Sequence, residues 1–234
     1  MRRPPVPAAW LTVLSWVSLG AAFLSAAWIL FDIYGRGHRQ PMGVMEAVWP
    51  VTALYFGPAA VAGYRALGRP ASGRWQQRHG DPPPKPAWAA TAVGVSHCGA
   101  GCTLGDVIAE FAVFALGATI AGRALFAEYV GDFVLALVLG VAFQYFAIAP
   151  MRGLGVRKGL TEAAKADVLS LAAFEIGLFG WMALMAFVFF PAPHHLRPDS
   201  PVYWFLMQIG MVAGFFTAWP VNTWLIRRGV KEAM

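Results

Sequence analysis

The chain consists of long apolar segments separated by shorter polar connections. A helix needs roughly 20 apolar residues to cross the ~30 Å hydrocarbon core of a bilayer. Six segments approach or meet this requirement: Ala8–Phe31, Ala47–Tyr64, Cys102–Gly122, Phe133–Ala149, Val168–Phe190 and Val202–Ile226. A weakly apolar stretch from Ala87 leads into the third segment. The pattern predicts an all-α integral membrane bundle of six transmembrane helices.

The composition supports the membrane class. Hydrophobic residues make up 58% of the chain and charged residues 13%, whereas soluble domains have roughly 45–50% and about 25%. The first apolar run is longer than the ~7–15-residue core of a signal peptide, so it is interpreted as a retained span. We expect one membrane domain over residues 1–234, with a Pro- and Arg-rich cytoplasmic loop at residues 65–87.

Basic residues predict the orientation of the helices. Lys and Arg are concentrated at the N-terminus, in loop 65–87, between the fourth and fifth segments and in the C-terminal tail. The positive-inside rule therefore places both termini in the cytoplasm, and we expect the chain to lie in a cytoplasmic (inner) membrane. Because these loops account for the net charge of +6, the charge does not indicate a nucleic-acid partner.

The sequence SHCGAGCTLGDVIAE, residues 96–110, concentrates the reactive side chains, including both cysteines of the chain. As one straight helix, residues 88–122 would be about 50 Å long, which is more than the hydrocarbon core accommodates. Gly99, Gly101 and Gly105 favour a bend. The third helix is therefore expected to be broken or extended at its cytoplasmic end.

Four residues of this motif are candidate metal ligands. Residues four apart share a helix face, so Cys98, Cys102, Asp106 and Glu110 form one row with His97 at its edge. Imidazole and thiolate bind copper, zinc and iron, and thiolates select monovalent copper. The pattern predicts a transition-metal site formed by His97, Cys98, Cys102 and Asp106, with copper favoured over zinc or iron. The alternative is that the glycines and cysteines are small residues that allow close helix packing.

Further polar residues occur at similar depth in the predicted helices. Acids inside a membrane usually face a protein interior or a wet cavity, because charge is unfavourable in lipid. Glu110, Asp167 and Glu175 are expected to form an ion or proton relay, supported by Gln144 and Asn222. These groups fall mostly in the cytoplasmic half of the spans, which predicts a polar pocket open to the cytoplasm.

The stretch HCGAGCTLGD, residues 97–106, resembles a bacterial polytopic membrane family catalogued as domain of unknown function 4396. The H-C-G-x-G-C-x-L-G-D pattern carries the resemblance, and the stretches APMRGLG and EAAKAD extend it, so that it covers the chain from about Trp88 to the C-terminus. The resemblance implies a membrane protein in which this motif is important, and it implies no substrate.

These observations favour a protein that binds a transition-metal ion in the membrane and transports or delivers it. The alternatives are a non-catalytic membrane subunit or assembly factor whose motif packs against a partner, and a thiol/quinone oxidoreductase. The chain has no P-loop, dinucleotide fingerprint or hydrolase constellation and no signal for haem, nucleotide or flavin, so a non-enzymatic role is favoured. Besides the lipid bilayer and the metal ion, the expected partners are a second copy of the chain or another membrane protein.

Overall fold

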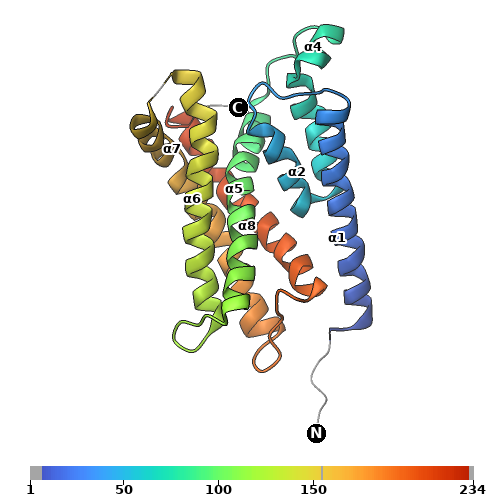
Figure 1. The fold of residues 1–234 in the computed structure, drawn as a ribbon, viewed down its shortest axis with the longest axis vertical. Coiled ribbons are helices and arrows are strands. Elements are labelled where there is room, and N and C mark those ends of the chain that lie inside the picture. Colours follow the sequence, from blue (N-terminus) through green and yellow to red (C-terminus); the bar gives the residue numbers. More distant parts are fainter. Residues whose placement is uncertain (1–6, 154, 232–234) are drawn as a thin grey trace.

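The computed structural model describes residues 7–153 and 155–231, which form a helical bundle (Figure 1). Five long helices build the bundle: α1 (Ala9–Leu30), α5 (Ala87–Leu116), α6 (Ala124–Arg152), α7 (Val156–Leu184) and α8 (Pro201–Arg227). Short π-helical turns extend α1 to Gly35 and α7 to Phe189. Each long helix contains an apolar segment of membrane-spanning length, and within the described ranges there is no β-strand. The predicted all-α membrane class is therefore confirmed.

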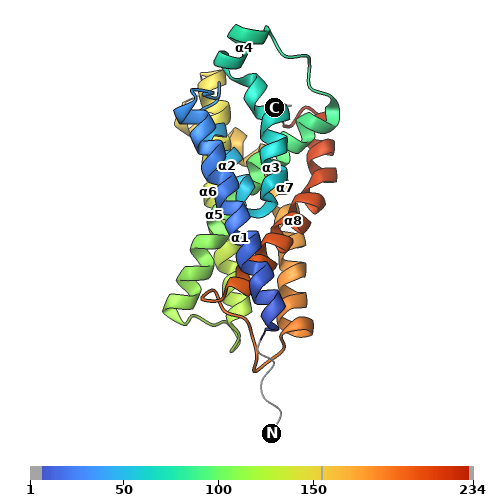
Figure 2. The ribbon, with the colours of Figure 1, turned by 90° about the vertical axis from the view of Figure 1, so that its right-hand side faces the viewer.

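The segment predicted as the second transmembrane helix is a hairpin that does not cross the bundle. Its first arm, α2 (Met45–Phe56), has 12 residues and is about 18 Å long, too short for the ~30 Å core. Gly57 interrupts the helix with φ 54° and ψ −131°, a conformation that glycine adopts readily. The second arm, α3 (Pro58–Gly63) with a π-helical turn (Tyr64–Gly68), returns to the end where α2 began (Figure 2). Among the described residues, five helices rather than six could span a membrane.

The hairpin changes the predicted topology by one crossing. The upper end of the bundle is defined here as the end that carries α4 (Gly73–His79) and the last turn of α8 (Figure 1). α1, α6 and α8 run upward, whereas α5 and α7 run downward. The prediction that both termini lie on one side is therefore wrong, because α1 begins at the lower end and α8 finishes at the upper end. Arg2 and Arg3, which supported that prediction, lie outside the described residues.

α5 is a single unbroken helix, contrary to the break predicted at its glycines. Its 30 residues are about 45 Å long, so it is the extended helix that the sequence offered as the alternative. The helix ends before Gly117, whose φ of 60° is left-handed. Residues 118–122, which were predicted to continue the span, belong to the loop that follows.

The glycines of α5 allow close packing against α6. A Cβ on Gly101 would lie 2.7 Å from the Cα of Gly140, and a Cβ on Gly105 would lie 2.5 Å from the backbone N of Ala136. Neither glycine can carry a side chain unless the α6 backbone moves. The two contacts are one helical turn apart on both helices, as in a small-residue seam between membrane helices. The glycines thus serve packing within the chain.

The outer surface of the bundle is strongly apolar. Trp10, Trp16 and Leu24 of α1 are 68%, 63% and 74% exposed, and water disfavours large exposed apolar patches. Contact with lipid removes this penalty, so the chain is a multi-pass membrane protein.

Candidate functional site

α5 directs the reactive side chains of its motif into the bundle. His97, Cys98, Cys102, Asp106 and Glu110 all have 0% relative exposure. They occupy successive turns of one helix, so the row extends over about 20 Å. The four predicted metal ligands therefore lie in series rather than around one point. Within residues 7–153 and 155–231, no three His, Cys, Asp or Glu side chains are placed to hold one metal ion together.

At the upper end of the row, His97 lies near an ion pair between α7 and the C-terminal tail. The Nζ atom of Lys231 donates a hydrogen bond of 3.0 Å to Oδ1 of Asp167, and both side chains are fully buried. His97 is within electrostatic reach of both charged groups. Neither of its ring nitrogens has a hydrogen-bond partner among the described residues.

The predicted supporting residues Gln144 and Asn222 are also buried. The Asn222 amide donates a hydrogen bond of 2.6 Å to the Ser170 hydroxyl and thereby joins α8 to α7. Its Oδ1 atom faces α5, where a Cβ on Gly94 would lie 3.9 Å away. Because Oδ1 of Asn222 and Oε1 of Gln144 are unpartnered in the described part of the chain, both can still accept a hydrogen bond.

Both thiols lie in the core that α5 shares with α7 and α8. Cys98 and Cys102 are free and buried. Cys102 lies beside Cys98 and Glu175, and Asp106 is within electrostatic reach. The hydroxyl of Tyr55 on α2 reaches the same part of α5, 3.1 Å from the Cβ position of Gly99. The hairpin therefore contributes a polar group next to the thiols.

Asp132 on α6 belongs to the site and was missed by sequence reasoning. It is fully buried and lies close to Glu110, Glu175 and Asp106. The predicted fourth helix began at Phe133, which left Asp132 in a loop, whereas α6 begins about two turns earlier. The available signal was the pair of acids at positions 128 and 132, which share one helix face.

Asp106, Glu110, Asp132 and Glu175 form an acidic group that has no counter-charge among the described residues. None of their eight carboxylate oxygens has a hydrogen-bond partner among the described residues. Two unit charges about 4 Å apart repel by about 4 kcal/mol at an effective dielectric constant of ~20, and burial penalises each charge further. The four groups cannot all be ionised together unless a cation joins them. Such a group takes up protons or cations readily.

A cavity of about 540 Å³ lies at the lower end of the acidic group. Glu128 and Tyr203 line it together with the thioether side chains of Met182 and Met185. Tyr203 also lies beside Glu110, so the cavity adjoins the lowest buried acid of α5. His195 of the lower loop contributes to the cavity wall as well.

Together these residues form a series along the bundle, termed the polar column. From the lower end upward, it contains Glu128, Tyr203, Glu110, Asp132, Asp106, Glu175, Cys102, Cys98, His97, Asp167 and Lys231. Glu110 lies six residues before the end of α5, about 9 Å along the helix, and therefore in the lower part of the bundle. The polar groups thus occupy both the upper and the lower half of the bundle, whereas the sequence predicted that they lie mostly in one half.

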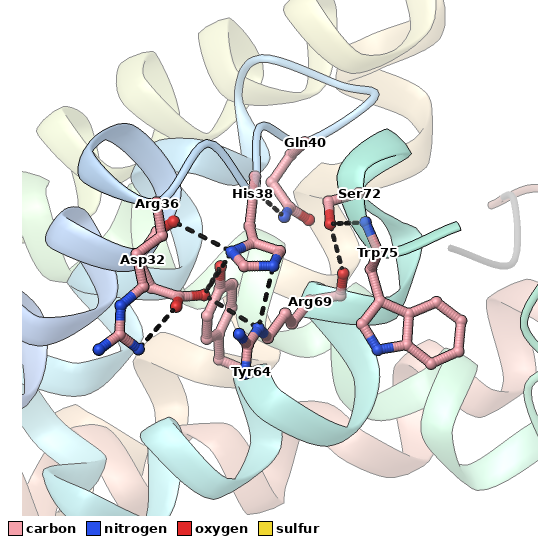
Figure 3. Close-up of polar contacts among 8 residues, drawn as sticks. All are labelled: Asp32, Arg36, His38, Gln40, Tyr64, Arg69, Ser72 and Trp75. Atoms are coloured by element: carbon pink, nitrogen blue, oxygen red, sulfur yellow. Dashed lines mark hydrogen bonds and ion pairs between the residues drawn. The ribbon is translucent and has the colours of Figure 1, made fainter. Parts of the chain in front are cut away.

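A separate polar cluster at the upper end joins α1 to the hairpin (Figure 3). The Tyr64 hydroxyl donates a hydrogen bond of 3.0 Å to buried Asp32, and Arg36 and Arg69 lie 3.4 Å and 3.3 Å from its carboxylate. Nδ1 of His38 is 3.3 Å from Asp32, while Nε2 accepts a hydrogen bond from Arg69. Burial lowers the pKa of His38, which favours the neutral ring that an accepting Nε2 requires. Because its buried carboxylate is paired with two guanidinium groups and a tyrosine hydroxyl, we interpret this cluster as a structural clamp.

Five apolar helices that enclose a buried polar column define a multi-pass membrane protein with an ionisable interior. The family model described as "Domain of unknown function (DUF4396)" matches residues 87–231, and the chain belongs to this family. The resemblance carried by HCGAGCTLGD is thereby confirmed. The matched region contains the whole polar column, whereas α1 and the hairpin precede it. Comparisons with curated proteins and with solved structures gave no match.

Proposed function

We propose that the protein is a bacterial inner-membrane carrier that moves a transition-metal cation, favouring monovalent copper, through the polar column in exchange for protons. The observation that carries the proposal is the acidic group of Asp106, Glu110, Asp132 and Glu175. It is buried, its carboxylate oxygens have no hydrogen-bond partner in the described part of the chain, and it adjoins two thiols.

The acidic group supports a link between cation binding and proton release. Carboxyl groups crowded in an apolar interior favour the protonated form, because burial and mutual repulsion both oppose charge. A metal ion that binds there supplies positive charge and displaces protons, as metal ligands must be deprotonated. When the ion leaves, the acids take protons up again. Metal movement in one direction is thereby coupled to proton movement in the other.

The sulfur atoms of the column support a soft cation as the cargo. Cys98 and Cys102 lie above the acids, and Met182 and Met185 line the cavity below them. Thiolate and thioether ligands select monovalent copper. Ligands that are spread along a column also suit passage, because an ion must bind strongly enough to enter each position and weakly enough to leave it.

The distribution of basic residues supports a cytoplasmic upper end. Only two described basic residues, Arg123 and Arg197, lie in the lower loops. Thirteen lie at or near the upper end: Arg36, Arg39, Arg65, Arg69, Arg74, Arg78, Lys85, Arg157, Lys158, Lys165, Arg227, Arg228 and Lys231. By the positive-inside rule, the upper end faces the cytoplasm and the cavity at the lower end faces outward.

The other two hypotheses have less support from the contacts. A motif that docks on a partner needs accessible small residues, but Gly101 and Gly105 are already covered by α6. Catalytic thiols usually lie in partly exposed, electropositive surroundings, whereas Cys98 and Cys102 are fully buried beside acids.

Reconstitution of the full chain into liposomes tests the proposal. The liposomes contain a copper(I) indicator and a pH dye, and the medium is reducing. We expect the wild type to take up copper with an opposite movement of protons, and Cys98→Ser/Cys102→Ser to lose copper uptake. Ser25→Ala is a matched control, since Ser25 is buried in α1 and bonds only its own helix at Ala21. Absence of copper uptake and of bound copper in the wild type would refute the proposed function.

A further inference from the structure

Lys231 brings a positive charge to the upper end of the polar column. Its ammonium lies 3.0 Å from Oδ1 of Asp167, and both side chains have 0% exposure. Cys98 and Cys102 are within electrostatic reach of the same ammonium, and His97 is within electrostatic reach of both members of the ion pair. The ammonium is therefore surrounded by the kinds of groups that would hold a metal cation.

The end of α8 is shaped to return Lys231 to the bundle. Gly229 has a left-handed φ of 68°, and the N–H groups of Gly229 and Val230 donate hydrogen bonds of 3.0 Å to the carbonyls of Ile226 and Leu225. This pair of bonds is the Schellman motif, in which glycine reverses the chain after a helix. The turn directs Lys231 inward, while the preceding basic residue Arg228 remains exposed.

The groups around Lys231 have unused binding capacity. Oδ2 of Asp167 and both ring nitrogens of His97 are buried and have no hydrogen-bond partner among the described residues. Gly140 of α6 leaves room beside this carboxylate, since a Cβ there would lie 3.2 Å from Oδ2. A carboxylate and an imidazole with free acceptor atoms can ligate a metal ion.

We propose that Asp167 and His97 form the upper cation site of the polar column, and that the ammonium of Lys231 fills this site as a tethered substitute for the transported cation. The ligand class is a soft or borderline transition-metal ion, and this identity rests on the proposed function. A metal ion occupies the site only when Lys231 leaves it. The C-terminal turn thus controls access between the column and the upper surface.

Zinc binding to the full chain in nanodiscs tests this proposal, because Zn²⁺ binds imidazole and carboxylate and has no redox chemistry. Lys231→Gln removes the competing charge, and Arg228→Gln is the matched control that removes an exposed charge. We expect Lys231→Gln to bind Zn²⁺ at least about tenfold more tightly than the wild type, which corresponds to about 1.4 kcal/mol. Arg228→Gln should bind as the wild type does, and Asp167→Asn/Lys231→Gln should lose the gain. Equal affinity of the wild type and Lys231→Gln would overturn the proposal.

Thiol accessibility provides a second measurement that depends on neither metal nor transport. The chain has two cysteines, and a small methanethiosulfonate reagent added from the upper side reports whether Lys231 covers them. If Lys231→Gln does not fold, the double variant Asp167→Asn/Lys231→Gln decides, because it leaves no buried charge unpaired. Labelling about tenfold faster than in Arg228→Gln supports the proposal that Lys231 covers the thiols, and equal rates overturn that proposal. If Lys231→Gln is labelled faster and binds Zn²⁺ more tightly but the wild type does not transport copper, only the proposed function is refuted, and the role of Lys231 stands.

Discussion

The seam between α5 and α6 gives a sharp test of how the polar column is held together. In Gly105→Ala, the added methyl group would lie 2.5 Å from the backbone N of Ala136 and 2.7 Å from the carbonyl carbon of Leu135. Ordinary carbon contacts are about 3.5–4.0 Å, so the two helices must separate by roughly 1 Å at this point. The obstructing atoms belong to the α6 backbone and cannot rotate away as a side-chain end can.

The expected magnitude follows from two opposing effects. Overpacking of a tight interior costs about 1–3 kcal/mol, while alanine is favoured over glycine in a helix by up to about 1 kcal/mol. We therefore expect Gly105→Ala to lower the free energy of unfolding by about 1–2 kcal/mol. Gly180→Ala on α7 is the matched control, because no heavy atom lies within 4 Å of its Cβ position. It should be neutral or slightly stabilising.

Unfolding of both variants in mixed micelles, followed by circular dichroism as denaturing detergent is added, measures the difference. Gly105→Ala should also reduce proton exchange, since separation of α5 from α6 moves Asp132 away from Glu110. If Gly105→Ala is as stable as Gly180→Ala, the close approach of the two backbones is not present in the folded protein, and the reasoning fails.

Three further predictions concern the buried polar groups. Asp132→Asn should raise thermal stability and abolish proton exchange, because it removes a buried carboxyl group that has no partner among the described residues; a destabilised variant in a thermal-shift assay would contradict this. Asp32→Asn should lower the free energy of unfolding by about 1–3 kcal/mol, since it leaves Arg69 without its carboxylate. Tyr64→Phe should lower it by only about 1 kcal/mol. Equal losses for the two variants in the detergent titration would argue against a charged clamp. Burial lowers the pKa of His38 in the folded protein, whereas the same ring takes up a proton near pH ~6.5 in the unfolded chain. The free energy of unfolding should therefore fall as the pH drops below that value. His38→Gln should show a smaller loss between pH 7 and 5 in unfolding titrations, and an unchanged loss would exclude His38 as the cause.

The long helices could be predicted from apolar content, but the second predicted span could not be resolved that way. Ala47–Tyr64 is apolar throughout, yet Gly57 and Pro58 in its middle form a turn and a helix start. Apolar content reports that a segment is buried or in lipid and does not report its direction. The extra predicted crossing placed residues 32–46 on the opposite side from loop 65–87, whereas both lie at the upper end of the bundle.

The row on α5 could be predicted because it depends only on helical spacing. Its partners depend on contacts between distant elements, which spacing does not encode. Lys231 and Asp167 are 64 positions apart, and their pairing requires the turn after α8. The only local signal for that turn is Gly229, a residue type that ends many helices without burying the next side chain.

The packing interpretation of the motif and the chemical one do not exclude each other. Gly101 and Gly105 face α6, and a Cβ on Gly131 of α6 would lie only 3.2 Å from the Cβ of Ala109. At this distance, side chains that flank the seam on both helices are forced towards each other. Asp106 and Asp132 are such neighbours, since each directly follows a glycine of the contact. The small residues therefore bring the two backbones together, and the acids next to them become crowded enough to require protons or a cation.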